Sequence, residues 1–254
     1  MNLFKQLLNK LLLGEGITRE SINSEKRISI DFYSKLISPG DLVFDVGANV
    51  GSRTRIFLEL GANVVAIEPQ DACVDVLQGL KNKIQLGKNQ KLIILKKVLG
   101  ESECMSEMMI SNVKVLSSLS KEWIDAVKKS GRFSDYVWDE KLPVSMTTLD
   151  GLIQEYGMPS FIKIDVEGYE FEVLKGLSWP VKNISLEFTP EYLRMTYQSI
   201  EYLDSLGKAI FNYSLGESMQ MGLENFVAAD ELINILDRYK NNHKIFGDIY
   251  CKYL

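Results

Sequence analysis

The chain has 254 residues, with 29 Lys and Arg side chains against 34 Asp and Glu, so its formal net charge is −5. Hydrophobic residues make up 46% and charged residues 25%, which is typical of a globular protein and excludes a disordered or fibrous one. The length suits one large α/β domain, or one domain with an insertion. The acidic balance argues against a broad nucleic-acid-binding surface, and no apolar run approaches the ~18 residues of a transmembrane helix.

The first 36 residues predict a helical extension. Apolar side chains recur at helical spacing over 1–13, which indicates an amphipathic helix. We expect it to pack against the protein's own body, with a membrane surface or a partner as the alternatives. Lys and Asn interrupt its apolar stretch and no small-residue cleavage site follows, so the sequence favours a cytoplasmic protein over a secreted one. A second helix is expected over 18–36.

The cysteine and histidine contents restrict the chemistry. Cys73, Cys104 and Cys251 fit no metal-ligand spacing and are expected to be reduced thiols. The only histidine, His243, lies in a polar segment that predicts an exposed turn. Serine–histidine triads and zinc sites with several histidines are therefore improbable.

From residue 41 onward, apolar runs of strand length alternate with helical patterns. Strands are expected at 41–47, 62–69, 91–100, 161–168, 183–188, 208–216 and 244–254. Helices are expected at 52–61, 71–82, 147–157, 169–177 and 199–207. This alternation predicts an α/β fold with a mostly parallel sheet and helices on both faces.

The long segment 101–143 lacks clear periodicity. It contains Trp123, Phe133, Tyr136 and Trp138, and aromatic residues are rare in disordered segments. Long insertions in compact domains are often functional, so we expect this one to cover the site.

A glycine-containing turn, Asp45–Gly51, follows the strand at 41–47. Its glycines allow a tight turn and a close approach of the backbone to a ligand. Glu68 ends the next strand, 21 residues after Gly47, where a carboxylate can accept both hydroxyls of a ribose. Asn49 replaces the middle glycine of a dinucleotide fingerprint. This departs from the binding of NAD and suits a nucleoside without a pyrophosphate, such as S-adenosylmethionine.

Several segments together resemble the FkbM-type S-adenosylmethionine-dependent methyltransferases. They are DVGANVG (45–51), IEP (67–69), SSL (117–119), VSMTTLD (144–150), KIDVEG (163–168), VLKG (173–176) and GDI (247–249). The resemblance implies a class I methyltransferase, Rossmann-like fold with seven strands, the last one antiparallel. It divides the chain into the extension 1–36 and a methyltransferase domain, 37–254, in which 101–143 is an insertion expected to cover the substrate.

The resemblance also implies roles for individual residues. Methyl transfer to a hydroxyl of a sugar, glycan or polyketide-like acceptor is expected. The methionine part of the cofactor would lie against Asp45, Gly47, Asn49 and Gly51, the ribose against Glu68, and the adenine near Leu99.

Three acidic residues are candidates for catalysis. Asp165 and Glu167 end one predicted strand and Glu187 ends the next, so they should face one crevice. With a single histidine in the chain, a carboxylate is the expected general base. Two alternatives stay open: Asp165 and Glu187 bind Mg²⁺, or Asp165 and Glu167 only shape the turn or contact the cofactor.

Three further side chains are expected to be structural. Lys163, inside a central strand, should pair with a neighbouring carboxylate, and Tyr169 and Trp179 should be core residues.

The resulting expectation is an O-methyltransferase with a small-molecule or glycan acceptor, no nucleic-acid partner and no transmembrane segment. The alternative is a catalytically silent module of the same fold that binds the cofactor and acts through a protein partner. A nicotinamide oxidoreductase is disfavoured by the glycine spacing.

Overall fold

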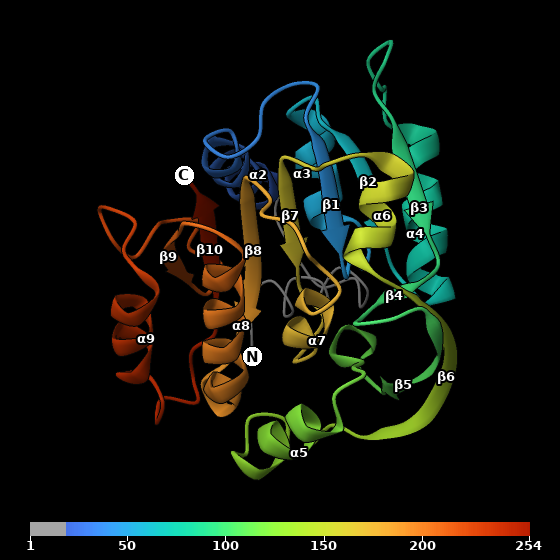
Figure 1. Cartoon of the computed structure of the whole chain (residues 1–254). Helices are drawn as coiled ribbons and strands as arrows, with labels where there is room; N and C mark the ends of the chain where they lie inside the picture. Colours follow the sequence, from blue (N-terminus) through green and yellow to red (C-terminus); the bar gives the residue numbers. More distant parts are fainter. Residues whose placement is uncertain (1–18) are drawn as a thin grey trace.

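A seven-stranded sheet forms the centre of the molecule (Figure 1). The computed structural model describes residues 19–254, so the predicted amphipathic helix over 1–13 lies outside the described residues. The strands are β1 (Leu42–Val46), β2 (Asn63–Ile67), β3 (Leu92–Leu95), β7 (Phe161–Ile164), β8 (Asn183–Phe188), β9 (Ala209–Leu215) and β10 (Gly247–Tyr253). Their order is β3-β2-β1-β7-β8-β10-β9, and β10 runs antiparallel to both of its neighbours. The predicted sheet with an antiparallel last strand is confirmed.

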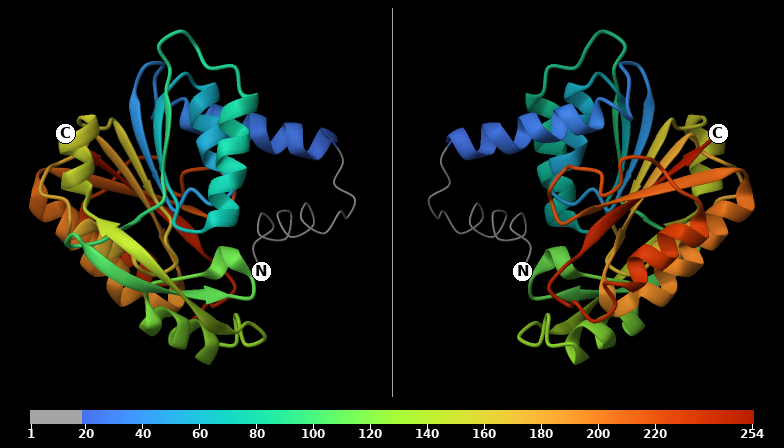
Figure 2. Two further views of the ribbon diagram at one scale, coloured as in Figure 1. Left: turned by 90° about the vertical axis from the view of Figure 1, so that its right-hand side faces the viewer. Right: turned by 90° about the vertical axis from the view of Figure 1, so that its left-hand side faces the viewer.

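Helices cover both faces of this sheet (Figures 1 and 2). One face packs against α2 (Arg19–Tyr33), α3 (Ser52–Glu59) and α4 (Asp71–Lys83). The other packs against α6 (Leu149–Tyr156), α7 (Glu170–Leu174), α8 (Leu193–Leu206) and α9 (Ala229–Asp237). The central strands are buried on both faces, because parallel strands between two helical layers have no solvent side.

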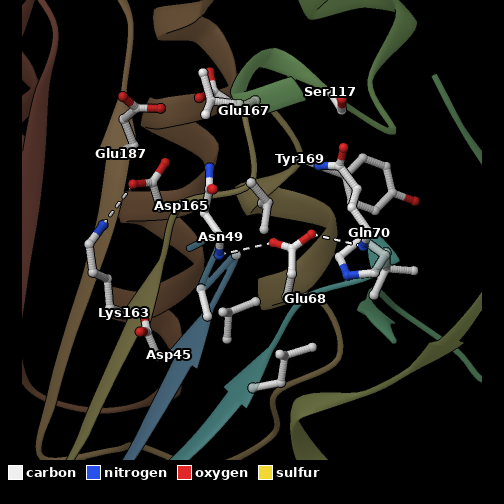
Figure 3. A pocket seen from close by; sticks show the side chains of 18 of the residues that line it. Asp45, Asn49, Glu68, Gln70, Ser117, Lys163, Asp165, Glu167, Tyr169 and Glu187 are labelled. Carbon is white, nitrogen blue, oxygen red and sulfur yellow. Dashed lines mark hydrogen bonds and ion pairs between the residues drawn. The ribbon is translucent and has the colours of Figure 1, made fainter. Parts of the chain in front are cut away.

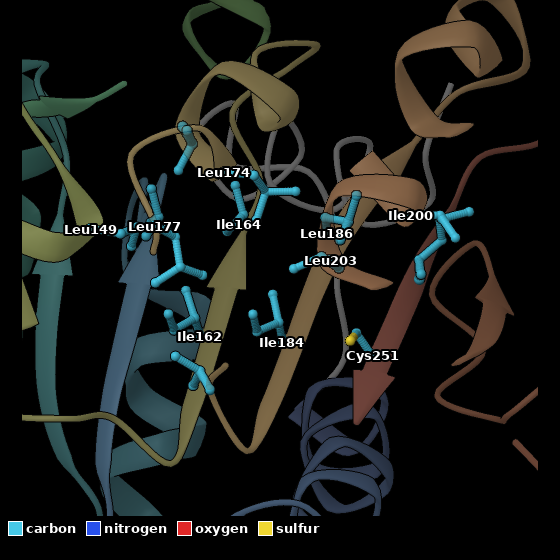
Figure 4. Packing of buried hydrophobic residues seen from close by; sticks show 14 of the residues in the cluster. Leu149, Ile162, Ile164, Leu174, Leu177, Ile184, Leu186, Ile200, Leu203 and Cys251 are labelled. Carbon is cyan, nitrogen blue, oxygen red and sulfur yellow. The ribbon is translucent and has the colours of Figure 1, made fainter. Parts of the chain in front are cut away.

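The larger apolar core lies under α6 to α9 (Figure 4). Ile162 and Ile164 of β7 alternate with Phe161 and Lys163, so the isoleucines face this core and the other two side chains face α2 and α3. Phe32 and Tyr33 of α2 pack into the second core, beside Phe161. The end of the predicted extension therefore contributes to the folded domain.

The end of one predicted strand belongs to a second, three-stranded sheet. Residues 91–100 do not form one strand: β3 stays in the large sheet, and β4 (Val98–Leu99) pairs with the end of β6 (Trp138–Thr147). β5 (Cys104–Ser111) pairs antiparallel with β6, with a register shift between Ile110 and Ser111. Most of this ribbon is partly exposed on both faces, so its sequence lacks the alternation that would have predicted it.

The insertion has a small core of its own. Between β5 and β6 lie the 3₁₀ turn η1 (Lys114–Leu116) and the helix α5 (Lys121–Lys129). Leu116, Trp123, Ile124, Val127 and Phe133 are buried against one another there. This unit lies beyond the carboxyl ends of the parallel strands, at the bottom of Figure 1.

One predicted core residue is not buried, and another has two roles. Trp179 is 56% exposed, so the prediction that it belongs to the core is wrong; it lies in the connection between α7 and β8. Tyr169 packs against the core as expected, and it also lines the cleft described below. Within residues 19–254, no helix is both long enough and apolar enough to cross a membrane.

Candidate active site

A cleft that is open to solvent lies at the carboxyl ends of the parallel strands (Figure 3). The main sheet, the small sheet and the insertion all contribute to its walls. The structure places eight of the nine predicted site residues in its lining: Asp45, Gly47, Asn49, Glu68, Leu99, Asp165, Glu167 and Glu187. The exception is Gly51, which is the N-cap of α3.

The turn after β1 is pressed against the end of β7. The backbone amides of Gly47 and Ala48 both donate to the carbonyl of Ile67 at 3.0 Å, which joins this turn to the end of β2. Gly47 has φ +79°, and a Cβ there would overlap the carbonyl of Asp165. At Gly51, with φ +80°, a Cβ would come within 2.7 Å of Leu77 on α4. Gly51 therefore lets the turn pack closely on α4. Gly51 does not line the cleft itself, but this packing positions the residues of the turn that do.

Asp45 lies deep under this turn. Its carboxylate is buried and accepts a hydrogen bond from the Thr54 hydroxyl at 2.5 Å, which fixes the first turns of α3 onto β1. Burial raises the pKa of Asp45, while the Thr54 hydrogen bond and the Lys163 charge oppose that rise. This side chain is held by the fold before any ligand binds.

Glu68 joins the turns after β1 and β2. Its two carboxylate oxygens accept the backbone amides of Asn49 at 3.0 Å and Gln70 at 2.9 Å. Burial raises the pKa of Glu68 to about 7, and these hydrogen bonds limit the rise. A carboxylate has roughly four lone-pair sites, so Glu68 can still accept hydroxyl donors from the cleft.

The wall beside Glu68 comes from the small sheet and the insertion. Leu99 of β4 lines it together with Val98, Met108, Val115 and Leu119. Gln70 attaches this wall to the loop after β2, because its Nε2 donates to the carbonyl of Lys114 at 3.1 Å. Of these residues, only Leu99 was predicted from the sequence to belong to the site.

Carboxylates gather at the opposite end of the cleft. Asp165, Glu167 and Glu187 each have an oxygen within 4.8 Å of the others. Lys163 lies beneath them, with its Nζ 3.0 Å from Asp165 and 3.7 Å from Asp248. Burial opposes the charge of Lys163, but the two aspartates outweigh burial and hold its pKa well above the ordinary value. The prediction that Lys163 pairs with a carboxylate is confirmed.

Three more charged residues at this end were not singled out as site residues. Arg53 on α3 is ion-paired with Glu217, and both line the cleft with Asp248. Asp248 lies opposite Glu187 in the pairing of β10 with β8. That register follows from the sheet topology, which sequence patterns alone do not supply. His243 is 43% exposed, as expected, and does not line the cleft.

Comparison of the sequence with known families decides the family. The Methyltransferase FkbM domain matches residues 45–213, which include all the predicted site residues, from Asp45 to Glu187. This chain belongs to the FkbM methyltransferase family. The family and the fold are those of class I methyltransferases that depend on S-adenosylmethionine.

The FkbM methyltransferase chain also resembles solved methyltransferase structures. A precorrin-6y C5,15-methyltransferase from Geobacter metallireducens GS-15 is 10% identical with a TM-score of 0.46, covering 94% of this chain and 90% of that one. A putative RNA methyltransferase from Pyrococcus horikoshii is 12% identical with a TM-score of 0.43, covering 91% and 84%. A putative methyltransferase from Streptococcus mutans, solved in complex with SAH, is 10% identical with a TM-score of 0.41, covering 93% and 99%. No curated protein sequence matches the chain.

Proposed function

We propose that this protein binds S-adenosylmethionine in the cleft and transfers its methyl group to a hydroxyl of a sugar, a glycan or a related small molecule. The observation that carries the proposal is the cluster of Asp165, Glu167 and Glu187 at the end of the cleft opposite Leu99. In this proposal a carboxylate of the cluster takes up the proton that the acceptor hydroxyl loses.

The order of the strands supports one orientation of the cofactor. Glu68 on the β2 side suits the ribose, and the apolar wall around Leu99 suits the adenine. The methionine part would then lie against the turn that contains Gly47 and Asn49, after β1. Since β7 and β8 are the next strands in the sheet, this orientation directs the methyl group toward Asp165 and Glu187.

The reaction in this arrangement is an in-line displacement. The acceptor oxygen forms a bond to the methyl carbon while the carbon–sulfur bond breaks and the positive charge of the sulfonium disappears. The proton of the hydroxyl passes to a carboxylate, for which Asp165 and Glu167 are the candidates. Holding the oxygen about 3–3.5 Å from the methyl carbon, in line with the sulfur, supplies much of the rate enhancement.

The same carboxylates also fit a divalent cation. Asp165, Glu167 and Glu187 offer oxygen ligands close enough to converge on one ion, and Mg²⁺ prefers such ligands. A bound Mg²⁺ would lower the pKa of a coordinated hydroxyl. Lys163 already contacts Asp165, so a bound cation would share this carboxylate with the Lys163 ammonium.

The end of the cleft that holds the carboxylate cluster is called the acceptor end below, and its charge favours neutral acceptors. Its carboxylates are those of Asp165, Glu167, Glu187, Glu217 and Asp248. Its cations, Lys163 and Arg53, both take part in ion pairs with these carboxylates. A phosphate group would therefore be repelled, whereas hydroxyl groups can donate hydrogen bonds to the carboxylates.

The test is methyl transfer to a panel of neutral sugars and oligosaccharides and to the corresponding sugar phosphates, with Mg²⁺ or with EDTA. S-adenosylhomocysteine formation and the mass of the acceptor are measured. We expect methylation of a neutral acceptor, with a kcat at least ~100-fold lower in Asp165→Asn. S-adenosylhomocysteine binding should be unchanged in that variant, and Asp230→Asn, on the exposed side of α9, serves as the control.

Each part of this experiment has a result that would count against the proposal or against one version of it. A wild-type kcat in Asp165→Asn would remove the role given to that residue. Tight S-adenosylhomocysteine binding with no methylation of any acceptor would favour the catalytically silent module. Loss of activity in EDTA, restored by Mg²⁺, would select the metal-assisted version over direct proton transfer.

A further inference from the structure

Ser118 connects the insertion to the loop after β7. Its backbone exchanges hydrogen bonds with Met109 of β5, at 2.9 and 3.0 Å. Its fully buried hydroxyl donates to the backbone carbonyl of Glu167 at 2.6 Å and accepts the backbone amide of Ser120 at 2.9 Å. The bond to Glu167 joins residues 49 positions apart, so it couples two segments that are distant in the sequence.

The loop that receives this bond has an unusual backbone. Glu167 has φ +54°, in the left-handed region that residues with a side chain rarely adopt and that costs energy. Glu170 stabilises the loop from one side, because its Oε1 accepts the amides of Val166 at 3.1 Å and Gly168 at 3.2 Å. Ser118 binds the same loop from the side of the insertion.

Trp123 of α5 packs on the next residue of this loop. Gly168 has φ +88°, and a Cβ at that position would overlap the Cβ and Cγ of Trp123. The indole Nε1 of Trp123 donates to the hydroxyl of Thr189 at 3.2 Å, two residues after Glu187. One buried tryptophan therefore contacts both the loop after β7, which carries Asp165 and Glu167, and the residue that follows β8, the strand that carries Glu187.

We propose that Ser118 is a positioning residue that, together with Trp123, holds the carboxylate of Glu167 in its place beside Asp165 and Glu187. The insertion then holds a carboxylate of the acceptor end in position, in addition to lining the cleft. Without the Ser118 hydroxyl, the buried carbonyl of Glu167 loses its hydrogen-bond donor. The backbone of Glu167 can then leave the left-handed region. This inference rests on the proposed function in one respect, namely that the Glu167 carboxylate takes part in methyl transfer.

The first test measures the loop itself. Amide hydrogen exchange over 163–170, with S-adenosylhomocysteine present, is compared in the wild type, Ser118→Ala and Ser111→Ala. Ser111 is the matched control, since it is also buried in the insertion and its hydroxyl accepts the amide of Val113 at 3.2 Å, inside the same segment. We expect faster exchange in Ser118→Ala alone, with the affinity for S-adenosylhomocysteine within about twofold of the wild type.

The second test separates positioning from a general loss of structure. With an acceptor that the wild type methylates, Ser118→Ala should lower kcat about tenfold, the effect of one buried hydrogen bond, with little change in KM. In a Glu167→Gln background, Ser118→Ala should lower kcat no further, because both changes act on the same group.

Equal exchange in the two serine variants, or additive losses of kcat in the double variant, would overturn the inference. If the wild type methylates no acceptor, the proposed function fails, and the exchange comparison still decides whether Ser118 holds the loop.

Discussion

Burial opposes the charge of Glu68, although both tasks of this side chain favour its ionised form. It joins the turns after β1 and β2 through the amides of Asn49 and Gln70, and it is the residue proposed to receive the ribose. Burial raises its pKa from 4.5 to about 7, so the folded protein favours the protonated form more than the unfolded chain does. The contribution of Glu68 to stability is therefore full below about pH 4.5 and is lost as the pH rises through about 7.

Cofactor binding should have the opposite pH dependence. An ionised carboxylate accepts hydrogen bonds from ribose hydroxyls more strongly than a protonated one, so the affinity for S-adenosylhomocysteine should rise between about pH 6 and pH 8. In Glu68→Gln we expect the affinity to be about tenfold lower and nearly independent of pH. Calorimetric titrations across this range measure both effects.

The control for this series is Glu231→Gln, an exposed glutamate on α9. It should keep the wild-type affinity and pH profile. Glu170 also has a pKa raised to about 7 by burial, so an unchanged pH profile in Glu68→Gln would transfer the effect to another group such as Glu170.

At the scale of elements, the turn after β1 and the loop after β7 fit together without space for a side chain. This contact sets the distance between the segment proposed to hold the methionine part and the segment that carries Asp165. A change of one methyl group at Gly47 should therefore affect the cofactor and the carboxylates together.

We expect Gly47→Ala to destabilise the protein by about 2–4 kcal/mol, because it adds an overlap with a backbone carbonyl to the strain of a positive φ. The affinity for S-adenosylhomocysteine should fall as well. Gly40→Ala is the matched control: its φ is +89°, and a Cβ there meets nothing within 4 Å. Thermal unfolding of both variants isolates the overlap, and equal losses of stability would contradict this account of the contact.

The elements also show how far the sequence could predict the structure. The strands that end at Val46, Ile67 and Ile164 carry short buried patterns followed by motif residues, so their site residues could be predicted. β5 and β6 could not be, because a ribbon that is partly exposed on both faces has no period-2 pattern. The strand predicted at 91–100 was wrong for a related reason, since its last residues leave the large sheet for the small one.

Long-range pairing limited the prediction of the site in the same way. Asp248 lies in the GDI segment (247–249), which is part of the family resemblance, but its place opposite Glu187 depends on β10 entering between β8 and β9. Ser118 likewise gains its partner, Glu167, only through the tertiary fold.

At the scale of the whole molecule, charge should decide which macromolecules approach the cleft. The net charge is −5, and the carboxylates of the acceptor end add a local negative field. Electrostatic attraction to phosphates supplies most of the non-specific binding of nucleic acids, and it is strongest at low salt.

We therefore expect no binding of short single-stranded or hairpin RNA in the micromolar range, even at about 20 mM salt. Fluorescence anisotropy with labelled RNA measures this, and a neutral glycan acceptor provides the positive comparison by calorimetry. Salt-sensitive RNA binding, or methylation of RNA, would contradict the expectation that the protein has no nucleic-acid partner.

The position of β10 has a consequence for solubility. It is paired along its length with β8 on one side and β9 on the other, so its departure would uncover two strand edges at once. Uncovered edges are templates for self-association into aggregates. The same seven residues include Asp248, which lies beside the buried ammonium of Lys163. Detachment of this strand would therefore remove part of the acceptor end and expose the aggregation-prone edges at the same time.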